Sequence, residues 1–334
     1  MPEIVLIPGD GIGQEVIPAA AEVLAALGLG LTFREAPAGF GHFERTGNAI
    51  PDETLADVEA AGLALFGATS SPSGGKAGYR SPILAMRQAF DLYANLRPTW
   101  SLPAISPRLG VDLLLVRENT EDLYVGRERR EGDTAIAERV ITAAGSERIA
   151  RVAFEQARRR RTAVRGPAVT VVHKANVLKV TDGLFRQGCQ AVAAAYPEIG
   201  FKEMLVDAMA LRLMRDPEAF DVIVTTNLFG DILSDQASYW MGGLGVAPSA
   251  NIGARVAVFE PVHGSAPDIA GQGVANPLGA ILAAAMLCDH IGQPAAGARV
   301  RGACAAALAD GVATRDLGGD ATTTDMTRAV LARL

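Results

Sequence analysis

Two aspartates stand four positions apart just after an apolar run, in the stretch NLFGDILSDQ at residues 227 to 236. If the preceding FDVIVTT is a strand and this stretch opens a helix, Asp231 and Asp235 project from one face of that helix, where a divalent cation could reach both carboxylates. The pair does not require a metal. Repulsion between two like charges at this spacing costs only about 0.2 to 0.5 kcal/mol, and the helix dipole stabilises an acidic group near the helix start by about 0.3 to 1 kcal/mol. The position favours a ligand site, since the carboxyl ends of strands line the ligand crevice in open α/β sheets.

Other predicted strands end in side chains of matching chemistry. VTVVHKAN closes with Lys174 and Asn176, VDLLLVRENTEDLY passes through Arg117 to Tyr124, and Asp207 follows the apolar stretch ending in MLV. Burial or a neighbouring cation can lower the pKa of a lysine into the range of a working base. Each of these groups could instead be an ordinary surface side chain.

The stretch SPILAMRQAFDLYANLRP, residues 81 to 98, adds Arg87 and Arg97 among apolar residues. The planar guanidinium matches a carboxylate with two parallel hydrogen bonds, so arginines on one wall suit a substrate with several carboxylates. An Arg87–Asp91 pair on an exposed helix face is the alternative. Together with Arg117 and a divalent cation site, the arginines favour a polyanionic substrate.

Composition narrows the class of protein. The chain has 334 residues, 49% of them hydrophobic, so it has room for two ordinary domains or one large α/β domain. A net charge of −6 argues against broad nucleic-acid binding, and we interpret the basic run Arg158 to Arg161 as a solvated helix end. Cys189, Cys288 and Cys304 lack CxxC spacing, which predicts buried thiols in a reducing compartment. The longest apolar run, Leu278 to Cys288, is too short to span a bilayer, so we expect a cytoplasmic protein with no membrane partner.

The pattern of apolar runs predicts the fold class. Six short runs end abruptly in polar or glycine-rich turns: IVLIP from Ile4, LALFG from Leu63, VDLLLV from Val111, VTVVH from Val169, FDVIV from Phe220 and ARVAVFE from Ala254. Segments with helical spacing lie between most of them, which predicts an α/β sheet with covering helices. GDGIG at Gly9 to Gly13 does not match GxGxxG, so an ordinary Rossmann fold is poorly supported.

Seven motifs, in order along nearly the whole chain, carry a family resemblance. They are GDGIGQEVIPAA, DLYANLRP, VRENTEDLYVG, HKANVLKVTDGLF, NLFGDILSD, GGLGVAPSANIG and EPVHGSAPDIAGQGVANP. The sequence resembles the β-decarboxylating dehydrogenases, which act on isocitrate, 3-isopropylmalate, homoisocitrate or tartrate. The resemblance implies a two-domain α/β fold with a large mixed sheet flanked by helices. It places a cofactor domain at 1–98 plus 253–334, and a substrate, metal and dimerisation domain at 99–252 with an arm near 125–142.

The resemblance also implies roles for the side chains at the strand ends. Enzymes of this family oxidise a 2-hydroxy acid beside a carboxylate that is then lost as CO₂. Mg²⁺ or Mn²⁺ is expected to bind Asp231 and Asp235 together with Asp207 of a second subunit. A homodimer is then the smallest functional unit, and a tetramer is the alternative assembly. Lys174, Tyr124 and Asp207 are the implied catalytic residues, with Lys174 as the base and Tyr124 helping to protonate the enol. The implied substrate-binding residues are Ser81, Arg87, Arg97, Arg117, Tyr124, Lys174 and Asn176.

NAD is the cofactor that the resemblance implies. Its expected contacts are Thr69, Asn176, Glu260, His263, Gly264, Ser265, Ala266, Asp268, Ile269 and Asn276. A carboxylate at Asp268 accepts from a ribose 2′-hydroxyl but repels a 2′-phosphate, so NAD is favoured over NADP. A helix-capping role is the alternative for Asp268.

Residues just before Arg87 bear on the choice of substrate within the family. Ser81 suits a distal carboxylate, whereas Ile83 and Leu84 offer apolar lining, and YRSPILAMR looks most like the homoisocitrate dehydrogenases of the α-aminoadipate route to lysine. Activity on isocitrate or 3-isopropylmalate stays an alternative, since one methylene gives only about 1 to 3 kcal/mol of discrimination. A non-catalytic regulatory subunit is another.

Overall fold

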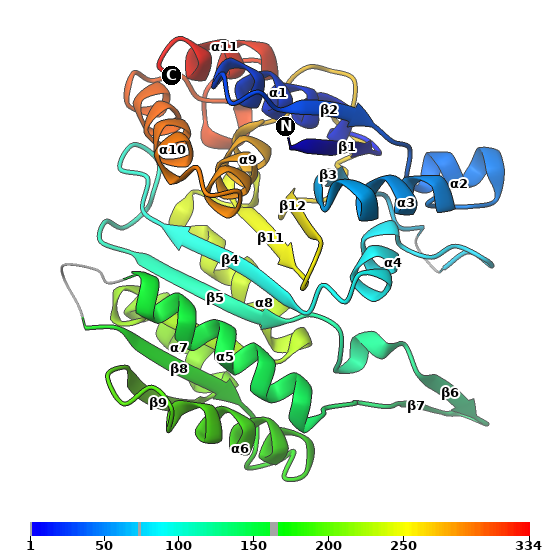
Figure 1. Ribbon diagram of the computed structural model, residues 1–334, viewed down its shortest axis with the longest axis vertical. Coiled ribbons are helices and arrows are strands. Elements are labelled where there is room, and N and C mark those ends of the chain that lie inside the picture. Colours follow the sequence, from blue (N-terminus) through cyan, green and yellow to red (C-terminus); the bar gives the residue numbers. More distant parts are fainter. Residues whose placement is uncertain (1, 73–74, 161–165) are drawn as a thin grey trace. The chain divides into compact units, whose positions relative to one another are not determined.

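The computed structural model of the protein describes residues 2–72, 75–160 and 166–334 (Figure 1). Contacts along the chain divide it into two compact units. Unit 1 comprises Met1–Leu92, Ser101–Leu109 and Ser238–Leu334, and unit 2 comprises Tyr93–Trp100 and Gly110–Ala237. The expected division into functional domains after residues 98 and 252 stays a prediction.

The described residues of unit 1 form five strands, in the order β2-β1-β3-β12-β11. Their bounds are β1 (Glu3–Gly9), β2 (Thr32–Glu35), β3 (Leu63–Ala68), β11 (Pro248–Ile252) and β12 (Ala257–Pro261). Neighbours are parallel except β11, which runs antiparallel to β12. The sheet of this unit is therefore mixed.

Helices cover both faces of the unit 1 sheet (Figure 1). One group packs together, namely α1 (Gly13–Ala26), α9 (Leu278–His290), α10 (Pro294–Ala309) and α11 (Thr323–Leu331). The others are α2 (Phe40–Thr46), α3 (Asp52–Ala61) and α4 (Pro82–Ala89). Alternate strand residues such as Val5 and Phe66 pack against Val58 of α3 and Met86 of α4 in one buried cluster. The run Leu278 to Cys288 is mostly buried within α9, and no helix in the described ranges is long and apolar enough to cross a membrane.

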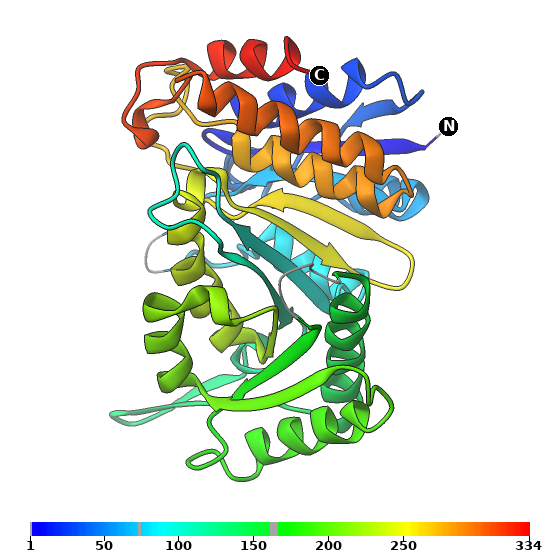
Figure 2. The same ribbon diagram turned by 90° about the vertical axis from the view of Figure 1, so that its left-hand side faces the viewer.

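Unit 2 has a second five-stranded arrangement, in the order β4-β5-β10-β8-β9. Its strands are β4 (Ala94–Trp100), β5 (Asp112–Glu118), β8 (Ala168–His173), β9 (Gly200–Leu205) and β10 (Val222–Thr225). Strand β4 runs antiparallel to β5, and the pairs β5/β10, β10/β8 and β8/β9 are parallel. The central strands are buried apolar runs because helices lie on both faces (Figure 2). Helices α5 (Ala143–Arg160) and α6 (Thr181–Ala193) lie on one face, and α7 (Val206–Arg215) and α8 (Asn227–Ser238) on the other.

Short elements complete the chain. Strands β6 (Glu128–Glu131) and β7 (Thr134–Ala137) form a separate antiparallel hairpin in unit 2. The 3₁₀ turns are η1 (Leu123–Val125), η2 (Pro217–Ala219), η3 (Tyr239–Met241), η4 (Leu244–Val246) and η5 (Arg315–Leu317).

The α/β class with mixed strands and flanking helices is confirmed, and all six apolar runs contain strands. The alternative of an exposed helical Arg87–Asp91 pair is wrong, because α4 ends at Ala89 and the Arg87 side chain is buried. The three cysteines are free and buried, as expected, and burial raises the pKa of the Cys288 thiol to about 11. Helix α5 ends at Arg160, and Arg161 of the basic run lies outside the described residues.

Candidate active site

The acidic pair of the NLFGDILSDQ stretch lies on α8, which begins two residues after β10 ends. The Asp231 side chain is 35% exposed and that of Asp235 is 52% exposed. Arg97 of β4 joins them, since its Nη2 lies 3.3 Å from Asp231 Oδ1 and its Nη1 lies 3.0 Å from Asp235 Oδ1. Both predicted acidic residues and a predicted arginine therefore form one cluster.

Arg117 enters the same cluster from β5. Its side chain is 1% exposed, its Nη1 lies 2.5 Å from Asp231 Oδ1, and its Nε donates to Asn227 Oδ1 at 2.9 Å. Gly230 leaves room for this side chain, because a Cβ at that position would lie 2.6 Å from Arg117 Cγ. The arginine and the start of α8 thus fit together only with glycine at position 230.

Tyr124, in the turn η1, completes the cluster. Its hydroxyl donates a hydrogen bond to Asp231 Oδ2, and the Arg117 guanidinium carbon lies 5.0 Å from the centre of its ring. Burial and the hydrogen bond to Asp231 raise the pKa of the Tyr124 phenol, although Arg117 opposes the shift. The phenol therefore stays protonated near neutral pH and can act as a proton donor.

Neutral hydrogen-bonding side chains that the sequence did not indicate fix the orientation of Arg97. Its Nε donates to Asn95 Oδ1 at 2.8 Å, and its Nη1 donates to Ser234 Oγ at 2.7 Å. Partial burial raises the pKa of Asp235, with the Asp231 charge adding to the effect and the arginines opposing it. Asn95 and Ser234, the two neutral partners of Arg97, could have been found from the period-2 spacing in β4 and from the i,i+3 spacing from Asp231 to Ser234.

A second charged pair of unit 2 joins two more predicted residues. Lys174, directly after β8, places its Nζ 2.5 Å from Asp207 Oδ1 in the first turn of α7. The hydrogen bond from Lys174 lowers the pKa of Asp207. Asn176 follows two residues later and is exposed. Over the described residues of this single chain, no three His, Cys, Asp or Glu side chains gather as a metal site.

Unit 1 holds most of the predicted cofactor residues in loops after β3 and β12. The Ser265 hydroxyl lies 2.9 Å from that of Ser70, next to Thr69, and the Ser265 carbonyl accepts from the Ile12 amide at 2.9 Å. Gly11 has φ +56°, and a Cβ there would meet the Ser265 carbonyl, so glycine is required for this approach. The GDGIG segment, although it is no Rossmann fingerprint, therefore packs against the predicted cofactor loop.

His263 presents a buried nitrogen into the loop that follows β12. Its Nδ1 lies 2.9 Å from the Gly264 carbonyl and so carries the proton, which leaves Nε2 as a buried acceptor with no hydrogen-bond partner among the described residues. Burial lowers the pKa of His263, so the ring is neutral at physiological pH. Asp268 and Ile269 lie in a turn where no helix begins, so the helix-capping alternative for Asp268 is wrong.

The other predicted residues of unit 1 engage each other or the backbone. Arg87 donates to Asn251 Oδ1 at 3.1 Å and lies 3.4 Å from the buried Glu260 carboxylate. The Asn276 side chain donates to Asp316 at 3.0 Å and accepts from the Leu278 amide at the start of α9. Ser81 immediately precedes α4.

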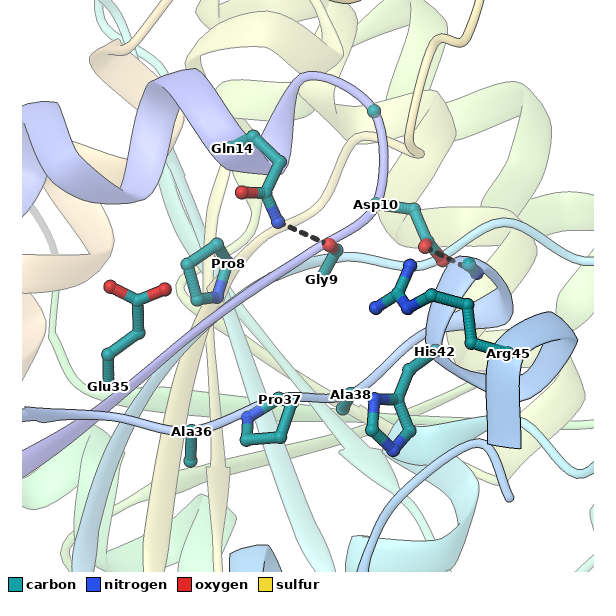
Figure 3. A pocket seen from close by; sticks show the side chains of 12 residues that line it. Pro8, Gly9, Asp10, Gln14, Glu35, Ala36, Pro37, Ala38, His42 and Arg45 are labelled. Atoms are coloured by element: carbon teal, nitrogen blue, oxygen red, sulfur yellow. Dashed lines mark hydrogen bonds between the residues drawn. The ribbon is translucent and has the colours of Figure 1, made fainter. Parts of the chain in front are cut away.

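A cavity of about 450 Å³ in unit 1 lies beside the same GDGIG segment. Figure 3 shows Gln14, Glu35, His42 and Arg45 around it. Asp10 in its wall accepts from the backbone amides of Phe40, Gly41 and Ser70, at 2.6, 2.9 and 2.9 Å. This carboxylate, which the sequence did not single out, joins the start of α2 and the loop after β3 to the GDGIG segment.

Comparisons with known proteins agree with this fold. The family model described as isocitrate/isopropylmalate dehydrogenase matches residues 3–330. The isocitrate/homoisocitrate dehydrogenase of Thermus thermophilus is 52% identical over 99% of this chain and 98% of the relative. The 3-isopropylmalate dehydrogenase of Methanothermobacter thermautotrophicus is 46% identical over 99% of this chain and 98% of its own.

A solved structure shows the same likeness. The crystal structure of isocitrate dehydrogenase from Methylococcus capsulatus superposes with a TM-score of 0.94 at 45% identity, covering 100% of this chain and 99% of that one. The fold and the site define a β-decarboxylating hydroxy-acid dehydrogenase. The chain belongs to the isocitrate/isopropylmalate dehydrogenase family.

The close fit of Gly230 against Arg117 gives a first prediction. We expect Gly230→Ala to destabilise the protein by about 1 to 3 kcal/mol, because the methyl group overpacks a buried side chain. Gly302→Ala is the matched control: Gly302 lies in α10 with open space around its Cα, so alanine there should stabilise by about 0.4 to 1 kcal/mol. Urea unfolding followed by circular dichroism measures both, and equal midpoints for the two variants would contradict the packing argument.

Proposed function

We propose that the protein is an NAD-dependent homoisocitrate dehydrogenase that converts homoisocitrate to 2-oxoadipate and CO₂ in the α-aminoadipate route to lysine. The observation that carries the proposal is the cluster of Arg97, Arg117 and Tyr124 around Asp231 and Asp235. Two guanidinium groups beside two carboxylates and a protonated phenol suit a substrate that has several carboxylates and passes through an enolate.

The acidic pair fits a Mg²⁺ or Mn²⁺ ion. Carboxylate oxygens are the ligands that these cations prefer, and both aspartates keep part of their surface accessible. Asp231 and Asp235, with Asp207 of a second copy, would hold the ion. When bound, it would supply Lewis-acid polarisation of the substrate hydroxyl and α-carboxylate.

The chain's own residues supply the binding and the proton transfers. Arg97 and Arg117, which pair with Asp231 in this structure, would donate hydrogen bonds to substrate carboxylates, and Arg87 is assigned the same role. Lys174 would take the proton of the substrate hydroxyl, and the Tyr124 phenol would return a proton to the enol. Asp207, whose charge is favoured beside Lys174, would hold the ammonium group of that lysine in place through their ion pair.

A homodimer would bring Lys174 and Asp207 of one copy to the acidic pair of another. Exposed apolar side chains support this assembly, since Leu211 and Met214 of α7 and Ile232 of α8 face outward from unit 2. Val177 and Val180 in the loop after Lys174 are also exposed. Apolar surface on the elements that carry the catalytic residues is suited to burial against a second copy.

The loop after β12 fits NAD. The buried Nε2 of His263 can accept a hydrogen bond from an amine such as that of adenine, and the exposed Asp268 carboxylate can accept from a ribose hydroxyl. Gly264, Ser265 and Ala266 offer close backbone approach, with Thr69, Ile269, Asn276, Glu260 and Asn176 as further contacts.

Preference for homoisocitrate rests on the start of α4. Ser81 would meet the distal carboxylate, while Ile83 packs partly on the core and Leu84 stays half-buried, which supports a longer apolar arm. The Thermus relative is named for isocitrate and homoisocitrate, and the Methanothermobacter relative for 3-isopropylmalate, so either of the other two substrates is the second candidate.

A substrate panel tests the proposed function. With NAD and Mg²⁺, we expect kcat/KM for homoisocitrate to exceed that for isocitrate and 3-isopropylmalate by about tenfold. A preference for 3-isopropylmalate would assign Leu84 to an isopropyl pocket and overturn the homoisocitrate proposal. No NADH from any of the three substrates would favour the non-catalytic subunit.

Cofactor choice gives a separate prediction. Replacing Asp268 by Lys and Ile269 by Tyr should raise the ratio of kcat/KM with NADP to that with NAD by about tenfold or more, because a cation replaces the carboxylate that repels a 2′-phosphate. The control Glu22→Lys makes the same charge change on the exposed side of α1 and should leave the ratio unaltered. An unchanged ratio in the double variant would count against this position for the adenosine.

A further inference from the structure

Arg139, two residues after β7, is held between two fully buried aspartates of unit 2. Its side chain is 12% exposed, whereas those of Asp122 and Asp182 are 0% exposed. The arginine Nε donates to Asp122 Oδ1 and Nη1 donates to Asp182 Oδ1. The remaining nitrogen, Nη2, donates to Thr226 Oγ1 at 2.8 Å, and the Phe229 ring centre lies 4.9 Å from the guanidinium carbon.

The other oxygens of the two aspartates accept backbone amides next to the candidate catalytic groups. Asp182 Oδ2 accepts from the Lys174 amide at 2.5 Å. Asp122 Oδ2 accepts from the Leu228 amide at 3.0 Å, in the first turn of the helix that carries Asp231. Asp122 also caps the turn that holds Tyr124, since its Oδ1 accepts from the Leu123 amide at 2.9 Å.

The backbone at Asp122 shows how strongly this cluster determines the local structure. Its φ of +69° and ψ of −148° lie in a region that favours glycine. A non-glycine residue persists there only when its surroundings fix it, and the buried carboxylate between Arg139 and two amides does so. Removing the cation would leave two buried carboxylates without charge compensation.

We propose that the Asp122–Arg139–Asp182 cluster is a positioning device that sets Lys174, Tyr124 and the start of α8 relative to one another. The inference rests on the proposed function for the roles of Lys174, Tyr124 and Asp231. Arg139 is the cation shared by both aspartates, and each aspartate fixes a backbone amide by accepting a hydrogen bond from it. In this proposal the cluster acts through these amides and not by contact with the substrate.

The same unit offers a matched control at the opposite end of β8. Arg160, 19% exposed, also bridges two aspartates, with its Nη2 2.6 Å from Asp112 and its Nε 3.1 Å from Asp221. Asp221 accepts from the amide of Ala168, the first residue of β8, at 3.1 Å. In the same way, Asp182 accepts from the amide of Lys174, which directly follows the last residue of β8. Arg160→Gln therefore breaks a second Asp–Arg–Asp cluster, which is more exposed at Asp112 and lies at the other end of β8 from Lys174.

Amide hydrogen exchange at residue resolution tests the device without relying on activity. In Arg139→Gln the amides of Lys174 and Leu228 should exchange about tenfold faster or more, with that of Ala168 unchanged. In Arg160→Gln the pattern should be reversed. Unchanged exchange at Lys174 and Leu228 in folded Arg139→Gln overturns the inference, whatever the protein's substrate is.

Steady-state kinetics separate positioning from general stability. Arg139→Gln should lower kcat about 10- to 100-fold with KM for NAD unchanged, whereas Arg160→Gln should keep kcat within about twofold of the wild type. Arg139→Lys, which keeps the charge, should recover part of kcat. If Arg139→Gln does not fold, Asp182→Asn and Asp182→Ala replace it. The asparagine side chain keeps an oxygen that can accept from the Lys174 amide, whereas alanine does not. We therefore expect kcat to fall less in Asp182→Asn than in Asp182→Ala.

The two kinds of failure are distinguishable. An inactive wild type with the predicted exchange pattern refutes the proposed function and leaves the positioning device supported. An active wild type whose kcat is lowered equally by Arg139→Gln and Arg160→Gln refutes the positioning device alone.

Discussion

A guanidinium that is almost fully buried has to be neutralised where it lies, and in unit 2 Asp231 neutralises that of Arg117. An unpaired charge in such a place would cost several kcal/mol, so the start of α8 has to approach β5 closely enough for contact. Gly230 permits that approach, and Asn227 takes the second donor of the arginine. Tyr124 then stacks on the guanidinium and donates to the same aspartate. The candidate site follows from this single ion pair.

The charges of the cluster also limit what it can bind. Arg97 and Arg117 face Asp231 and Asp235, so two positive and two negative groups balance within one chain. A metal cation bound to Asp231 and Asp235 would compete with the arginines for these carboxylates, so the arginines would need other anions. A polycarboxylate bound to Arg97 and Arg117 would in turn leave the two aspartates without their cations. We therefore expect the metal and the substrate to favour each other's binding.

Much of the fold and part of the site could be predicted from the sequence. The central strands are continuous apolar runs because both faces of the sheet are covered, and the spacing of Asp231 and Asp235 gives their common face. Strand β4 could not be predicted from the sequence, because its segment ANLRPTW mixes polar and apolar residues and follows a segment with helical spacing. The partners of Arg139 lie 17 and 43 residues away, and no local spacing connects them.

Mn²⁺ binding tests the central claim most directly. Titration of the wild-type protein with Mn²⁺, followed by electron paramagnetic resonance and corrected for Mn²⁺ chelated by free substrate, should show homoisocitrate tightening the apparent Kd about 5- to 150-fold. Asp231→Asn should abolish that gain. An identical Kd with and without the substrate, or a gain that survives Asp231→Asn, would contradict the assignment of metal and substrate to this cluster.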